Sequence, residues 1–370
     1  MKLALVGNYG ATNVGDDAIM GSILKSHPTH EWTVFSANPE ETREKFLVKS
    51  APLFPLGVRS LFKYGFRTSV RAMKSVEAVV VGGGGLFQDS HLFACFLWGW
   101  QVWWALRLGK PLFIYATGVG PLKTGLGKRI TRWVYGHASG VTVRDQKSYD
   151  RLVELGVDPA KVEITADPAF LFKASEQEKT RHPHSVLISL RPWLGHNAKT
   201  IEAFATYLLK LKAEKSATFA FVSMQGVREH DHQVFDPLVK RVGGVVLAPK
   251  DFPELIELLE QAEFAIGMRY HFLIAALIAR TPTLAVSYSP KVESLYEGDL
   301  APYCVPVEGL SAEILEKRMV RLSIDYNTFK LYARSRVAQR CERASKNTGF
   351  LEGFIKTLTK ARETDRLSQQ

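Results

Sequence analysis

The sequence has few of the features that stabilise secreted or fibrous proteins. Only three of its 370 residues are cysteines, and they form no CxxC pair. An odd, widely spaced set of cysteines argues against a disulfide framework and a structural zinc site. Low-complexity tracts and internal repeats are also absent, which excludes a disordered chain and a solenoid. We therefore expect a globular protein of a reducing, cytoplasmic compartment.

Long apolar runs are missing as well, because none reaches the ~20 residues of a membrane-spanning helix. The most apolar segment, Leu92–Leu108, contains Gly99, Gln101 and Arg107. Its pattern favours a buried helix, and a tryptophan-rich helix at a membrane interface is the alternative. The first ten residues, MKLALVGNYG, contain only a short apolar run before glycines, which lacks the length of the apolar core of a signal peptide and predicts a first strand.

Acidic residues are outnumbered by basic ones, 37 against 48, which gives a formal net charge of +11. Such a surplus attracts phosphorylated metabolites, lipid head groups or nucleic acid. The cations are spread along the chain without a basic arm, so we expect no nucleic-acid partner. An acidic small molecule is the expected ligand, with peripheral contact at the inner face of a membrane as an additional partner.

Short β-branched runs alternate with helical patterns in two series. This alternation predicts parallel sheets covered by helices on both faces. We predict an α/β protein of two doubly wound Rossmann-like domains, over residues 1–172 and 185–311. A polar linker over 173–184 joins them, and a helical segment over 312–370 follows. Ligands bind such sheets beyond the carboxyl ends of the strands, so we expect the site in a cleft between the domains.

The first predicted strand is followed by the glycine-rich turn GNYGATNVGDD, which begins at Gly7. Its spacing fits neither the dinucleotide-binding fingerprint nor a P-loop. Asp16 is positioned to cap the next helix, whose amino end favours an anion. Asp17 follows it. An ordinary strand–turn–helix connection is the alternative reading of this segment.

Two further glycine turns follow predicted strands. The run GGGGLFQD contains Gly83, Gly84 and Asp89, and four glycines in succession imply that a ligand or a packed neighbour approaches the backbone closely. The turn GVGP precedes a basic cluster that would form a solvated helix face or meet an anionic acceptor or lipid. The cluster consists of Lys123, Lys128, Arg129 and Arg132.

Cations follow the strands of the second domain. Arg191 in SLRPW offers a planar fork for carboxylate or phosphate. Arg269 and His271 in GMRYH combine a fixed charge with a titratable imidazole at a helix entry, which suits anion binding with proton transfer. Lys291 in SYSPK adds a fourth cation. An interdomain ion pair for Arg191 and a capping or packing role for His271 are the alternatives.

No metal site is predicted. His230, Asp231 and His232 could ligate an ion, but adjacent polar residues in a loop are usually solvated. The HExxH, GxSxG and protein-kinase motifs are absent.

In this order, the motifs resemble those of the polysaccharide pyruvyl transferase family. The resemblance covers roughly residues 1–300, from GNYGATNVGDDAI through GGGGLFQD, GVGP, TADPAF and SLRPW to GMRYHFLIAALIARTP and SYSPKV. It implies a GT-B-like fold, phosphoenolpyruvate as donor, and a sugar of a polysaccharide or lipid-linked glycan as acceptor. The implied product is a pyruvate ketal, and no cofactor is expected.

The resemblance makes Arg269 a donor-binding position and His271 a catalytic one, with Arg191 as a second donor contact and Lys291 as a weaker candidate. Family members often have serine where this chain has Gly85, which removes one hydroxyl contact. The remaining assignments come from the residues alone: Asp17 as a second catalytic group, Gly83 and Gly84 as donor-binding amides, and Asp89 as an acceptor contact.

Two other functions remain open at this point. A nucleotide-sugar glycosyltransferase of the same architecture would need a carboxylate near the ribose, and Glu293 could supply it. A non-catalytic scaffold at the membrane would use the net charge and the Leu92–Leu108 segment.

Overall fold

The computed structural model describes residues 1–56, 65–89, 92–176, 179–193, 197–225 and 231–368. Contacts divide the chain into two compact domains. The first contains Met1–Ala11, Asp16–Leu171 and Arg340–Gln370, and the second contains Thr12–Gly15 and Phe172–Gln339. The segment predicted as a separate helical piece, 312–370, is therefore divided between the two domains.

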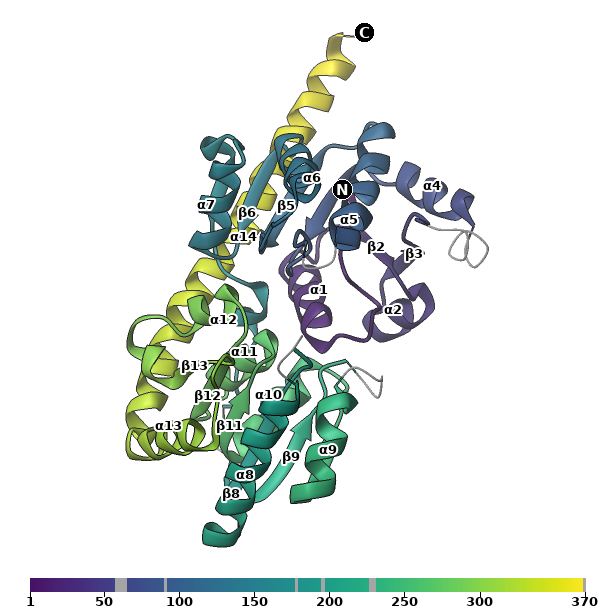
Figure 1. Cartoon of the computed structure of the whole chain (residues 1–370). Coiled ribbons are helices and arrows are strands. Elements are labelled where there is room, and N and C mark those ends of the chain that lie inside the picture. Colours follow the sequence, from purple (N-terminus) through teal and green to yellow (C-terminus); the bar gives the residue numbers. More distant parts are fainter. Residues whose placement is uncertain (57–64, 90–91, 177–178, 194–196, 226–230, 369–370) are drawn as a thin grey trace. The chain divides into compact units, whose positions relative to one another are not determined.

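A seven-stranded parallel sheet forms the first domain, with strand order β3-β2-β1-β4-β5-β6-β7 (Figure 1). The order reverses between β1 and β4, and doubly wound sheets bind ligands at such a switch point. Strands β4 and β5 are buried along their whole length, as expected for a sheet with helices on both faces. The strands are β1 (Lys2–Val6), β2 (Glu31–Ser36), β3 (Lys49–Pro52), β4 (Ala78–Gly82), β5 (Leu112–Thr117), β6 (Gly140–Val143) and β7 (Val162–Ile164).

Helices cover both faces of this sheet because alternate strand residues point to opposite sides. Ala4 and Val6 of β1 enter one core, and Leu3 and Leu5 enter the other. The first core includes residues of α4 (Phe66–Ser75), α5 (Leu92–Arg107), α6 (Gly125–Gly136) and α7 (Gln146–Glu154). The second includes residues of α1 (Val14–Ser26), α2 (Pro39–Phe46) and the C-terminal part of α14 (Tyr326–Ser368).

A polar cluster also fixes α14 to the first domain. Oε1 of Glu352 lies 2.8 Å from Nδ1 of His27 and 3.1 Å from Nε2 of His30. Burial lowers the pKa of His27, and the carboxylate of Glu352 offsets this only in part. The three side chains lie close enough to hold a metal ion. The sequence gives no sign of this grouping, because Glu352 is 322 residues from His30.

The second domain contains a six-stranded parallel sheet of order β10-β9-β8-β11-β12-β13, so its switch point lies between β8 and β11 (Figure 1). Strand β8 begins at His182, inside the segment predicted as a linker over 173–184, because His182 already pairs with Ala262 of β11. The strands are β8 (His182–Ser189), β9 (Thr218–Val222), β10 (Val245–Leu247), β11 (Ala262–Gly267), β12 (Thr283–Ser287) and β13 (Cys304–Pro306).

Helices also pack in groups in this domain: α8 contacts α9 and α13, and α10 contacts α11. Helix α11 is buried from Phe272 to Ile278, which explains its apolar sequence. The helices are α8 (Asn197–Lys215), α9 (His232–Val242), α10 (Phe252–Gln261), α11 (Tyr270–Ile278), α12 (Pro290–Leu295) and α13 (Ala312–Ile324). Short 3₁₀ turns are η1 (Pro159–Lys161), η2 (Pro168–Leu171) and η3 (Gly298–Tyr303).

The predicted fold class of two doubly wound α/β domains is confirmed. The residue pattern over Arg59–Ser75 predicts a helix; residues 59–64 of that range lie outside the described residues, and the described part contains α4. The apolar segment Leu92–Leu108 forms α5 as a helix, as predicted, but the helix is buried on one side only, because Phe93, Phe96 and Trp103 are exposed. Among the helices that the structure describes, none is long and apolar enough to cross a membrane.

Candidate functional site

The glycine run after β4 lies at the switch point of the first sheet. Gly83 and Gly84 have φ values of +56° and +72°. Residues that carry a Cβ rarely adopt such values. A Cβ on Gly83 would lie 2.0 Å from Cγ2 of Ile19. A packed neighbour therefore explains Gly83, and the predicted amide contacts of Gly83 and Gly84 with a donor remain predictions.

Asp16 does not cap α1, contrary to the sequence prediction. The helix begins at Val14, so Asp16 lies within its first turn. Oδ1 of Asn13 instead accepts a hydrogen bond from the backbone N–H of Gly15 at 3.0 Å. Asp16 accepts one from Nδ2 of Asn8 at 2.7 Å.

Asp17 has an ion-pair partner in its own domain. Its carboxylate lies 2.6 Å from Nζ of Lys45 on α2. Burial raises the pKa of Asp17, and Lys45 offsets that rise only in part. The raised pKa is compatible with proton transfer, and the catalytic role of Asp17 remains a prediction.

Asp89 holds a turn of the first domain together. Its carboxylate accepts hydrogen bonds from N–H of Lys123 at 2.6 Å and from Oγ1 of Thr124 at 2.7 Å. Burial would raise the pKa of Asp89, but the backbone N–H groups of Lys123 and Thr124 more than compensate and lower it. This arrangement gives Asp89 a local structural role, and its contact with an acceptor remains a prediction.

The predicted cations of the second domain follow neighbouring strands. Ser189 and Gly267 are paired residues at the ends of β8 and β11, and Arg191 and Arg269 each stand two residues further on. The backbone pairing continues past these ends, since N–H of Met268 donates to the carbonyl of Ser189 at 2.7 Å. The register thus places both arginines at the switch point of the second sheet.

Arg191 and Lys291 converge on the phenol ring of Tyr288, the first residue after β12. Nη1 of Arg191 donates to the Tyr288 hydroxyl at 3.1 Å, and the guanidinium carbon lies 4.7 Å from the ring centre. Nζ of Lys291 lies 5.3 Å from the same ring centre. The ring of Trp193 packs against Tyr288 at a centroid distance of 5.0 Å. The structure therefore brings together two residues predicted separately from two sequence motifs.

Tyr288 is buried, which by itself would raise the pKa of its hydroxyl. Lys291 and Arg191 outweigh burial and lower the pKa of Tyr288 to about 7. A phenol usually titrates near 10. Tyr288 is therefore a group that can exchange a proton near neutral pH beside two fixed cations.

Arg269 is anchored by an acidic residue. Its Nη2 contacts the carboxylate of Asp231, which is fully buried, and donates to Oε1 of Gln225 at 3.3 Å. Asp231 also accepts from N–H of Met224 at 3.4 Å. Arg269 therefore neutralises the charge of Asp231, which was considered above as a metal ligand. His230, considered with it, lies outside the described residues.

Three buried polar atoms in this region have no hydrogen-bond partner among the described residues: Nε of Arg191, Nε of Arg269 and Oγ of Ser289. A buried donor without an acceptor costs about 1–3 kcal/mol. Buried polar groups in native structures usually have a partner, which can be a protein group, a water molecule or a ligand. The two guanidinium groups are therefore candidate contacts for the oxygen atoms of an anion.

His271 lies in the first turn of α11 and contacts the end of the first glycine turn. A Cβ on Gly15 would lie only 2.0 Å from Nδ1 of His271. The segment around Gly15 belongs to the second domain, where N–H of Val14 donates to the carbonyl of Met224 at 3.1 Å. Gly15 is required because the imidazole occupies the space of a side chain.

Sequence reasoning missed Tyr288, Asp231 and Gly15 as members of this site. Tyr288 directly follows a predicted strand and precedes Lys291, which lowers its pKa most, but Arg191, the second cation that lowers it, is 97 residues away. Asp231 lies 38 residues from Arg269, so no local pattern links them.

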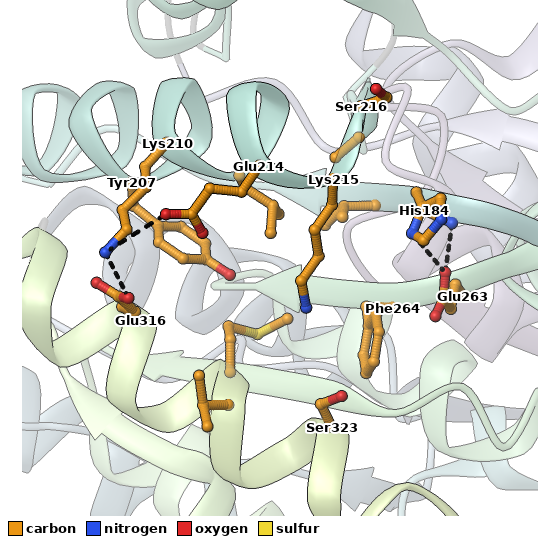
Figure 2. A pocket seen from close by; sticks show the side chains of 15 residues that line it. His184, Tyr207, Lys210, Glu214, Lys215, Ser216, Glu263, Phe264, Glu316 and Ser323 are labelled. Atoms are coloured by element: carbon orange, nitrogen blue, oxygen red, sulfur yellow. Dashed lines mark hydrogen bonds and ion pairs between the residues drawn. The ribbon is translucent and has the colours of Figure 1, made fainter.

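A pocket of about 530 Å³ lies elsewhere in the second domain (Figure 2). His184 and Phe264 place it at the amino ends of β8 and β11, the opposite edge of the sheet from Ser189 and Gly267. Its lining mixes charges, and Lys210 pairs with Glu316 at 2.6 Å across two helices. This pocket therefore shows no preference for an anion and lies away from the strand ends that carry the cations.

The Tyr288 cluster predicts a titration that can be observed directly. Tyrosinate absorbance of the ligand-free protein should rise with a midpoint near pH 7, and Tyr288→Phe should abolish that step. Arg191→Ala should move the midpoint upward because it removes one stabilising cation. Absorbance near 295 nm measures this, with Tyr303→Phe as control, because the pKa of Tyr303 is raised to about 12. An unchanged titration in Tyr288→Phe would contradict the assignment.

Two of the solved structures with a similar fold contain UDP. HepE of Anabaena in complex with UDP and glucose has a TM-score of 0.66 at 13% identity, covering 96% of this chain and 100% of that chain. The S. aureus MnaA–UDP structure has a TM-score of 0.65 at 13% identity, covering 97% of both chains. At this identity the likeness shows the fold alone. That fold is the two-domain, parallel-sheet architecture of GT-B-like enzymes.

The family model for polysaccharide pyruvyl transferase matches residues 13–290, and this chain belongs to that family. Amylovoran biosynthesis protein AmsJ of Erwinia amylovora is 23% identical, covering 79% of this chain and 84% of that protein. The predicted family and the predicted transferase class are confirmed. The protein is a transferase of polysaccharide biosynthesis.

Proposed function

We propose that the protein transfers the pyruvyl group of phosphoenolpyruvate to two hydroxyls of one sugar in a polysaccharide or lipid-linked glycan. The observation that carries this proposal is the pair of half-buried arginines at adjacent strand ends, each with a buried Nε that has no hydrogen-bond partner among the described residues. Lys291 adds a third cation near Arg191 through their shared contact with Tyr288. A carboxylate and a phosphate on one small molecule match such a set of donors.

The proposed reaction balances without a cofactor. A proton adds to the methylene carbon of phosphoenolpyruvate, and a sugar hydroxyl adds to the neighbouring carbon. The bond from that carbon to the phosphate oxygen then breaks, and a second hydroxyl of the same sugar closes the ketal. Of the two hydroxyl protons, one balances the proton taken up by the methylene carbon and the other leaves with phosphate.

His271 and Tyr288 are the proposed proton carriers of the second domain. The amino end of α11 and the neighbouring Arg269 favour an anion beside His271. Tyr288, with a pKa of about 7, can hold or release a proton at neutral pH. Asp17 as a catalytic group and Asp89 as an acceptor contact are further proposals on the first domain.

A nucleotide-sugar glycosyltransferase is the competing function, since structures of similar fold contain UDP. Its carboxylate would be Glu293, which is exposed and accepts a hydrogen bond from Oγ of Ser287 at 3.3 Å. Lys291 and the two arginines suit a compact trianion better than a ribose.

Calorimetric titration separates the two functions. We expect phosphoenolpyruvate to bind and UDP not to bind, and Arg191→Ala to weaken phosphoenolpyruvate binding by roughly 10- to 100-fold, since hydrogen bonds to charged groups are worth about 1.5–3 kcal/mol. Arg334→Ala, an exposed position of the same domain, is the control. Incubation with phosphoenolpyruvate and a panel of glycosides should release phosphate and add the mass of the ketal. Tight UDP binding without phosphate release would favour the glycosyltransferase.

We also propose that the protein works in the cytoplasm at the inner face of the membrane, where a lipid-linked acceptor would be available.

A further inference from the structure

Helix α5 presents an aromatic stripe to solvent. Phe93, Phe96 and Trp103 are 64%, 42% and 40% exposed. Trp100 is half-buried and stacks on Trp103 with ring centres 5.4 Å apart. Spacings of three and four residues place these side chains on one face of a helix. Large aromatic side chains gathered on a surface usually mark an interaction site.

The remaining sides of α5 are packed, so the stripe is its only free face among the described residues. Trp98, Val102 and Ala105 lie in the core of the first domain. Gly99 allows α6 to approach closely, because a Cβ there would lie 2.7 Å from Cγ2 of Ile130. Because the other sides of α5 pack against the core and α6, the aromatic stripe faces solvent.

The stretch of sequence that contains the stripe carries no acidic residue. From residue 90 to residue 144 the sequence contains no aspartate or glutamate, and this span includes both α5 and its neighbour α6. Arg107 continues the stripe by one helical turn and is exposed. Four more exposed or half-exposed cations belong to α6 and the turn before it: Lys123, Lys128, Arg129 and Arg132.

We propose that this stripe and these cations form a docking surface for an anionic lipid bilayer, with α5 lying in the plane of the interface. Phenylalanine and tryptophan rings partition into the head-group region of a bilayer. Lysine and arginine add attraction to anionic lipids at the same surface. Stable peripheral binding usually requires two such signals together, and the first domain supplies both.

Charge also decides against a second copy of the chain as the occupant. Pairing two identical stripes would bring the cations of α5 and α6 close to those of the partner. Like charges brought together in this way oppose association, whereas an anionic bilayer neutralises them. The proposal is independent of the pyruvyl transfer, because binding to vesicles requires neither donor nor acceptor.

Co-sedimentation with vesicles tests the surface. The full-length, tag-free protein should pellet with phosphatidylcholine vesicles that contain phosphatidylglycerol, and much less with phosphatidylcholine alone. The variant Phe93→Ser with Trp103→Ser should weaken partitioning by about tenfold or more, because it removes two aromatic rings that would insert into the bilayer interface. The variant Lys128→Gln with Arg129→Gln should weaken it roughly fivefold per charge.

Matched variants in the second domain control for general surface effects. Leu331→Ser removes an apolar side chain that is 66% exposed, and Lys317→Gln with Arg334→Gln removes two exposed cations; both should bind vesicles like the wild type. Circular dichroism should show that every variant is folded.

Failure of the wild type to bind anionic vesicles would overturn the proposal, as would equal losses in the control variants. Concentration-dependent dimers that disappear in the aromatic variant would assign the stripe to self-association instead.

Discussion

Replacing His271 by alanine is expected to lower turnover by about 10²- to 10⁴-fold, the usual contribution of a general acid or base. The imidazole lies at the amino end of α11, within the segment that also contains Arg269. Affinity for phosphoenolpyruvate should change little, because the proposed anion contacts are made by the arginines. Phosphate release measures turnover, and calorimetry measures the affinity separately.

His232→Ala is the matched control for this experiment. His232 lies in the same domain, is half-exposed and pairs only at the surface with Asp236, at 3.0 Å. Its replacement should leave turnover unchanged. Turnover of His271→Ala within a few-fold of the wild type would remove His271 from the mechanism. A parallel fall in unfolding temperature would instead indicate that its packing against Gly15 matters more than its proton.

Most strands could be predicted because a buried parallel strand has a recognisable local sequence, a short β-branched run followed by turn residues. Two elements were missed for the converse reason. Strand β3 has the sequence KSAP, with only Ala51 and Pro52 buried. Helix α2 has the sequence PEETREKF and buries only Thr42. Neither segment has the apolar periodicity from which secondary structure is read.

The cations of the candidate site were equally predictable, since Arg191 and Arg269 follow strand ends. Their partners were not, because Asp231 and Tyr288 reach them only through tertiary contacts. The same limit applies to Gly15, whose missing side chain is explained by His271 in another part of the sequence. Position relative to a sheet can be inferred from sequence, whereas the chemistry of a site depends on which loops meet there.

The largest effect on stability is expected from Arg269→Ala. Asp231 is fully buried, and this change would leave its carboxylate without a cation. Removing one partner of a buried pair typically costs about 3–5 kcal/mol. Urea-induced unfolding should show a loss of this size. The surface pair of Arg241 and Glu202 provides the contrast, because Arg241→Ala should leave the unfolding midpoint nearly unchanged.

Adding Asp231→Asn to Arg269→Ala separates the two roles of the arginine. An asparagine carries no charge and can still accept the hydrogen bond from N–H of Met224, so the double variant should recover much of the lost stability. Its affinity for phosphoenolpyruvate should stay low, because the guanidinium group is still missing. If instead the double variant binds phosphoenolpyruvate like the wild type, Arg269 serves only to neutralise Asp231, and the anion must be held by Arg191 and Lys291.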